Sequence, residues 1–301
     1  MKMIHVWRRV AVALGAAVAL CAAEGPAGAQ YFLRYTGDGA PRRIRDALTV
    51  VTEAEQSIDT GHGVLARWLF WALEGMIQDA ADSLPDSDAV WEVGAARHWI
   101  EKKNAAKASR SLNRAGNELR RFAGVWDVGA AEPNCAALLA LTEKGDCPTA
   151  LAGIGALAGE ARMDPVRTLL EQAGERVAAA RDNLARGRGF EALKNAGDAK
   201  GKLRAALLGM RLSQAKILVA HARLMAGKGS RCRARWTLGR ASRRLARAGA
   251  LADAGGADAA GKIRADIDAA RHALRGSADV SLQLAQIEAK IVALIEKCCR
   301  G

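Results

Sequence analysis

The stretch from residue 187 to residue 207, GRGFEALKNAGDAKGKLRAAL, reads as a turn followed by a helix. Gly187 interrupts the preceding segment, and Ala192, Ala196, Ala199 and Leu203 then recur at helical spacing on one face. A stripe of small and medium apolar residues is typical of a helix packed against neighbouring helices. The sequence therefore predicts a helical hairpin whose bend lies at Gly187.

The same layout recurs at intervals of 42 residues on both sides of this stretch. A glycine precedes the stripe at Gly61, Gly145 and Gly229, and Lys103 takes the glycine's place in the remaining copy. The stripes of these copies are Ala66, Phe70, Leu73 and Ile77; Ala108, Leu112, Ala115 and Leu119; Ala150, Ile154, Leu157 and Ala161; and Ala234, Leu238, Ala241 and Leu245. A repeated unit of this size indicates an array of helical hairpins. The alternative is an irregular helical bundle, because 42 residues equal six heptads and Ala-rich helices match by chance at that period.

The second helix of each unit resembles the second helix of tetratricopeptide units. The resemblance rests on a small–large–small pattern such as Ala108, Leu112 and Ala115. It covers only that half of the unit, because the aromatic pattern of the first helix and the closing proline are missing. The period also exceeds the usual length of about 34 residues. The resemblance implies similar helix packing and not membership of that family.

The composition favours helices throughout the chain. Half of the 301 residues are apolar, aromatic residues make up only 4%, and alanine is abundant. We therefore predict an all-α fold with a helical-hairpin domain over residues 41–250 and a C-terminal helix pair over residues 251–301. The last helix carries a seam with coiled-coil spacing, which suggests either an intramolecular cap or a homodimer contact. The seam residues are Val280, Leu284, Ile287, Ile291, Leu294 and Cys298.

The N-terminal 29 residues have the pattern of a secretory signal peptide. Arg8 and Arg9 precede a short apolar region, and Ala27-Gly28-Ala29 form a small-residue cleavage site. The alternatives are cleavage after Ala23, an uncleaved membrane anchor, or a lipoprotein signal. Residues 30–40 then form an extended lead-in. We expect a secreted protein, which would be periplasmic in a bacterium, and this compartment argues against nucleic acid as the partner.

A basic helix is the clearest chemical feature of the expected mature chain. The whole chain carries a formal net charge of +13, and residues 228–247 contain eight basic residues and no acidic one. Arginine binds carboxylates and phosphates through two parallel hydrogen bonds. The candidate basic face comprises Arg231, Arg233, Arg235, Arg240, Arg243, Arg244 and Arg247. It would suit an acidic protein, an anionic envelope polymer or a lipid surface. The alternative is a solvated face paired with acidic residues of a neighbouring helix.

The helix after Gly61 offers a second candidate surface, because it carries Trp68, Phe70 and Trp71. Such a run most often lies in the core between neighbouring helices. Its functional interpretation is an apolar contact with a ligand or a membrane interface.

Five cysteines follow the expected cleavage site: Cys135, Cys147, Cys232, Cys298 and Cys299. Export would permit disulfides, of which Cys135–Cys147 and a bridge from Cys232 to Cys298 or Cys299 are the candidates. The alternative is that several are small buried apolar residues.

The sequence contains no motif that predicts catalysis, a metal site or a cofactor site. The His residues are scattered along the chain, and only His98 lies beside an aromatic residue, Trp99. We therefore expect a non-catalytic exported scaffold or binding protein with a basic face. The alternatives are an envelope- or lipid-associated protein that uses the aromatic helix, and an enzyme of unknown class.

Overall fold

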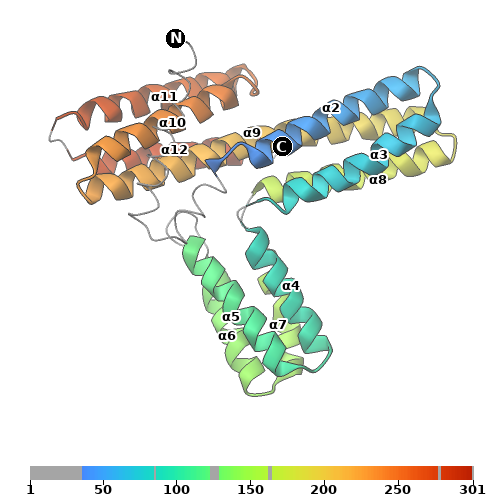
Figure 1. Ribbon diagram of the computed structural model, residues 1–301, viewed down its shortest axis with the longest axis horizontal. Helices are drawn as coiled ribbons and strands as arrows, with labels where there is room; N and C mark the ends of the chain where they lie inside the picture. Colours follow the sequence, from blue (N-terminus) through green and yellow to red (C-terminus); the bar gives the residue numbers. More distant parts are fainter. Residues whose placement is uncertain (1–35, 85, 123–128, 162–164, 277–278, 300–301) are drawn as a thin grey trace, which may run out of the picture. The chain divides into compact units, whose positions relative to one another are not determined.

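The computed structural model describes residues 36–84, 86–122, 129–161, 165–276 and 279–299. The expected signal peptide and most of the lead-in lie outside these residues. Within them the chain is helical and contains no strand, which confirms the all-α prediction (Figure 1). The helices are α2 (Gly39–Asp59), α3 (Gly63–Ala81), α4 (Ser87–Glu101), α5 (Ala105–Phe122), α6 (Ala131–Glu143), α7 (Cys147–Glu160), α8 (Pro165–Ala185), α9 (Gly189–Gly227), α10 (Arg231–Gly249), α11 (Ala254–Ala273) and α12 (Ser281–Cys299). None of the described helices is both long enough and apolar enough to cross a bilayer.

Five bends share one backbone geometry. Each has a residue with positive φ: Gly61 (79°), Lys103 (55°), Gly145 (80°), Gly187 (72°) and Gly229 (75°). At Gly187 the amide N–H donates to the Leu184 carbonyl at 3.1 Å, and the next N–H, of Arg188, donates to the Asn183 carbonyl at 2.9 Å. The other four bends have the same pair of hydrogen bonds. This is the Schellman motif, which caps the last carbonyls of a helix and turns the chain.

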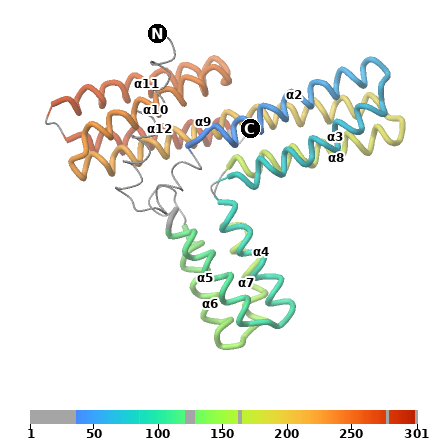
Figure 2. Tube along the Cα trace, viewed as in Figure 1, coloured from blue at the N-terminus to red at the C-terminus, as the bar shows by residue number. Residues whose placement is uncertain are grey.

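The described helices pack in three groups of four (Figures 1 and 2). The first group has one core, to which α2, α3, α8 and the first half of α9 contribute. The second group is α4 to α7, and its helices close into a ring because α4 contacts both α5 and α7. The third group joins the rest of α9 to α10, α11 and α12. Helix α3 packs on α8, which lies far from it in the sequence, so the first group is assembled from separate parts of the chain.

Helix α9 contributes to two of the three groups. It runs without a break from Gly189 to Gly227, passing through Gly209. Every residue from position 206 to position 215 is buried, so the middle of the helix is covered on all sides. The stretch at 250–257, whose glycine and alanine content suggests a linker, is a linker only as far as Asp253, which caps α11 by accepting a hydrogen bond from the Gly256 N–H at 2.7 Å.

A buried ion pair joins the N-terminus of α8 to the turn before α4. The Arg167 guanidinium donates to both carboxylate oxygens of Asp86, with a shortest N–O distance of 2.7 Å. It also donates to the Ser87 hydroxyl at 2.9 Å. Both charged side chains are almost fully buried, at 6% and 2% exposed. The pair therefore fixes where the chain leaves the first group and returns to it.

Candidate binding surfaces

The outer face of α3 is apolar and open to solvent. Val64 is 73% exposed, Leu65 52%, Trp68 65% and Trp71 63%. Phe70, which the sequence placed with the two tryptophans, is fully buried and belongs to the core of the first group. Its inclusion in a contact surface was wrong, because Phe70 lies on the inward stripe of the helix.

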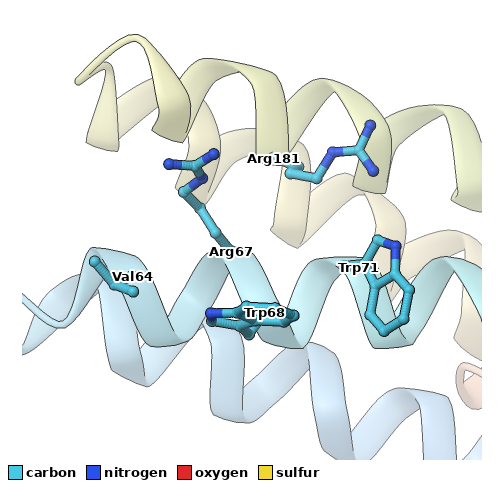
Figure 3. A pocket seen from close by; sticks show the side chains of 5 residues that line it. All are labelled: Val64, Arg67, Trp68, Trp71 and Arg181. Carbon is cyan, nitrogen blue, oxygen red and sulfur yellow. The ribbon is translucent and has the colours of Figure 1, made fainter.

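A groove lies between α3 and α8 beside these tryptophans. Val64, Arg67, Trp68, Trp71 and Arg181 line it, and its volume is about 600 Å³ (Figure 3). The indole rings of Trp68 and Trp71 meet edge to face, with centroids 6.1 Å apart and planes at 86°. Because both rings project from one side of α3, they form a continuous aromatic wall.

Two guanidinium groups supply the charge of this groove. Arg181, on α8, is held by Glu74 on α3, with Nη1 and Oε2 2.6 Å apart. Arg67 is exposed and has no ion-pair or hydrogen-bond partner among the described residues. Figure 3 shows both guanidinium groups on the α8 side of the groove, across from the tryptophans. The groove therefore offers apolar contact and a cation to the same ligand.

The α2–α3 and α8–α9 bends lie together at one end of the first group. A Cβ placed on Gly63 would lie 3.8 Å from Leu184, and one on Gly189 would lie 3.9 Å from Ile58. Phe190, the second residue of α9, is 80% exposed at this end. Sequence reasoning missed this residue, although its position in the unit, equivalent to Val64, was a usable signal.

The predicted basic face on α10 is only partly available to a partner. Arg231, Arg243 and Arg247 are exposed, Arg233, Arg235 and Arg240 are half-buried, and Arg244 is only 8% exposed. Arg231 donates to the Gly276 carbonyl at 3.2 Å, and the Arg240 guanidinium lies 5.0 Å from the centre of the Trp236 ring. Including Arg244 was wrong, because it flanks the inward stripe of α10.

The four cysteines whose side chains are described are free thiols, so the expected disulfides among them are not formed. These are Cys135, Cys147, Cys232 and Cys298, and the side chain of Cys299 lies outside the described residues. Cys135 is buried, and its thiol lies 3.1 Å from the Leu112 carbonyl oxygen. Burial raises the pKa of the Cys135 thiol to about 11. Cys135 therefore fits the alternative prediction, in which a cysteine serves as a small apolar core residue.

The apolar seam of α12 is used within the chain. Val280, Leu284, Ile287, Ile291 and Leu294 are all at most 6% exposed, and α12 packs on α9 and α11. Among the described residues, the seam is therefore covered within the chain, and a homodimer contact through α12 stays an untested prediction.

The described residues contain no candidate metal site. Among them, no three His, Cys, Asp or Glu side chains gather closely enough to hold a metal ion. The His98 ring packs edge-on against Trp99, with centroids 5.0 Å apart, and the Lys107 ammonium lies 4.1 Å from the centre of the same indole. Comparison of the chain with protein-family models, curated proteins and solved structures finds no match.

Proposed function

We propose that this protein is an exported, non-catalytic helical scaffold that binds its partner through the groove between α3 and α8. The partner combines an apolar part, which packs on Trp68 and Trp71, with an acidic group, which pairs with Arg67. The observation that supports this proposal most directly is the exposure of two adjacent tryptophans beside Arg67, which has no partner among the described residues. Exposed apolar surfaces of this kind mark interaction sites in soluble proteins.

The groove fits a partner better than the basic face of α10 does. On α10, Arg231 donates to a carbonyl, Arg240 lies over an indole ring and Arg244 is buried. Arg67 has no such internal role among the described residues, and Glu74 holds Arg181 in place at the groove's edge. Arg67 can therefore pair with an acidic group without first breaking a contact to another described residue, and the rigid indole rings beside it lose little conformational entropy on binding.

A small anionic probe tests the groove without assuming the natural partner. Anilinonaphthalene sulfonate joins an aromatic ring system to an acidic group, and its fluorescence rises in apolar sites. We expect Trp68→Ala with Trp71→Ala, and separately Arg67→Glu, to weaken its binding about tenfold, since each removes one of the two contacts. Trp91→Ala is the matched control, because Trp91 is 68% exposed but lies on α4. Unchanged affinity in the α3 variants would refute the groove as the binding site.

The basic face of α10 is the second candidate, with an acidic protein or an anionic envelope polymer as its partner. It is favoured by Arg243, which is exposed and has no partner among the described residues, and by Arg233 on the same helix. Retention on immobilised polyglutamate should fall with added salt and in the Arg233→Glu/Arg243→Glu variant. Arg42→Glu on α2 is the control, as its side chain is 78% exposed. Equal retention of both variants would exclude the α10 face.

We also propose that residues 39–249 are five copies of one 42-residue helical hairpin, paired into bundles with the C-terminal helices as a partner for the fifth. The support is the constant spacing of the five bends, their shared hydrogen bonds and the burial of equivalent stripe residues. Chance recurrence in alanine-rich helices would not reproduce the bend geometry at each copy.

A further inference from the structure

We propose that the end of the first group, where the α2–α3 and α8–α9 bends meet, docks onto the surface of an anionic lipid bilayer. The proposal rests on the proposed function, because the tryptophan groove begins at this end, and it names the partner of that groove. Val64, Leu65 and Phe190 would enter the headgroup region. Trp68 and Trp71 would lie at the level where indole rings are enriched in membranes.

The apolar residues at this end are not required by the fold. Val64 and Phe190 are 73% and 80% exposed, so they contribute little to the core. The equivalent second residues of α5 and α7 are Ala106 and Pro148, at bends with the same hydrogen bonds. A large apolar side chain is therefore present at both bends of the first group and absent from both bends of the second. Apolar side chains that cluster at one exposed end in this way mark an interaction site.

The spacing along α3 suits insertion of the helix end. Trp68 and Trp71 follow Val64 by four and seven residues, which places them about 6 and 10 Å further along the axis. The headgroup region on each side of a bilayer is about 5–10 Å deep. If the bend reaches the acyl boundary, the two indole rings lie in the interface, with their ring N–H groups able to donate to lipid oxygens.

The charges around this end favour acidic headgroups. Arg67, Arg186 and Arg188 are exposed at or near the two bends, and His62 lies in the α2–α3 bend with its ring Nδ1 2.9 Å from the Thr60 hydroxyl. The acidic side chains nearby are Asp59, Asp182 and Glu191. The Oδ1 atom of Asp182 lies 3.8 Å from Nε of Arg181. The phosphate of a lipid headgroup can pair with the arginines while the apolar side chains enter below it. A soluble acidic protein would explain the arginines but not Phe190 and Leu65.

Vesicle flotation tests the proposal on the whole chain. Vesicles of phosphatidylcholine with phosphatidylglycerol should bind the protein, and vesicles of phosphatidylcholine alone should bind it more weakly. We expect Phe190→Ser and Leu65→Ser each to lower partitioning onto the anionic vesicles about tenfold, because each removes one inserted side chain. The matched control is Leu282→Ser, since Leu282 is 74% exposed on α12. All variants share one N-terminus, so its contribution to binding is common to them.

Depth-dependent quenching gives a second readout. Lipids brominated near the top of the acyl chain should quench tryptophan fluorescence, and the quenching should fall in Trp68→Phe/Trp71→Phe but not in Trp91→Phe. Equal flotation of Phe190→Ser, Leu65→Ser and Leu282→Ser, or no flotation of the wild-type chain, would overturn the bilayer proposal. If the sulfonate probe still depends on Trp68, Trp71 and Arg67 in that case, the groove remains a binding site for a soluble partner. Loss of both dependences would remove the proposed function as well.

Discussion

At the scale of single residues, the Arg167–Asp86 pair is the interaction whose loss should cost most. We expect Asp86→Ala to destabilise the protein by about 3–5 kcal/mol, because it leaves a buried guanidinium without its carboxylate. The Ser87 hydroxyl, 2.9 Å away, cannot replace a charge. Chemical denaturation followed by circular dichroism measures the change in the free energy of unfolding.

An exposed pair provides the comparison for this substitution. Arg97 and Glu101 are 3.0 Å apart on α4, with side chains 60% and 46% exposed. Glu101→Ala should change stability by less than about 1 kcal/mol, because water screens the pair. Similar effects of Asp86→Ala and Glu101→Ala would mean that the buried pair is not a stabilising element of the junction.

The Cys135 thiol should be inert in the folded protein. Its pKa of about 11 keeps it protonated near neutral pH, whereas the thiolate is the reactive form. We expect iodoacetamide to modify exposed Cys232 in the native protein and Cys135 only after unfolding. Peptide mass spectrometry would show this order, and equal labelling would contradict it.

Because the thiol of Cys135 ionises near pH 9.0 in the unfolded chain, its burial also makes the free energy of unfolding fall as the pH rises from about 9 towards 11.

The fate of individual candidate residues was decided by helical register. Phe70 follows Ala66 by four residues and precedes Leu73 by three, so the stripe itself predicted its burial. Arg244 directly precedes the buried Leu245 and is buried with it. The groove was harder to predict, because it needs Arg181, which lies more than a hundred residues from Trp68 in the sequence. Nothing in a local pattern indicates which distant helix will stand beside α3.

At the scale of helices and bends, Lys103 is the exception to the rule that glycine occupies the positive-φ position. A side chain in this left-handed conformation costs about 1–2 kcal/mol, and the extra freedom of glycine in the unfolded chain offsets part of that cost. We therefore expect Lys103→Gly to stabilise the protein by about 0.5–1 kcal/mol. Thermal unfolding of the variant and the parent chain measures the difference.

The converse substitution should have the opposite sign. Gly187→Ala should destabilise the protein by about 1–2 kcal/mol. No atom lies within 4 Å of the added Cβ, so the cost comes from the backbone conformation alone. Gly201→Ala is the matched control, because Gly201 lies inside α9 with open space around it and alanine is favoured in helices. Stabilisation by Gly187→Ala would mean that the bend does not require a positive φ.

Glycines at the bends made the helix ends predictable, whereas glycines elsewhere were weaker signals. Gly61, Gly145, Gly187 and Gly229 each indicated a helix end, and the structure has a bend at each of them. Gly209 could have ended a helix but does not, because α9 is packed on all sides there. The helix of α11 begins within a stretch that looked like a linker, where the Asp253 cap outweighs the glycine content.

At the scale of the whole molecule, the grouping of the hairpins could not be predicted from the sequence. Each stripe combines alanine and leucine in nearly the same order, so any two hairpins could pack together on composition alone. The chain instead pairs α2–α3 with α8 and the first half of α9, and α4–α5 with α6–α7. Contacts between distant segments, such as the Arg167–Asp86 pair and the salt bridge between Glu55 and Lys200, select this arrangement.

Because the first two groups have separate cores, each should unfold locally without the other. Leu112 is fully buried in the core of α4 to α7, and Leu112→Ala should cost about 2–5 kcal/mol there. Hydrogen exchange read by mass spectrometry should then speed up across residues 87–161 and stay unchanged in α8 and α9.

Leu203→Ala is the counterpart, since Leu203 lies in the first core on α9. It should speed exchange in α2, α3 and α8, and in α10 and α12 as well, because α9 continues into the third group. Uniform acceleration by both variants would show instead that the described chain unfolds as one cooperative unit.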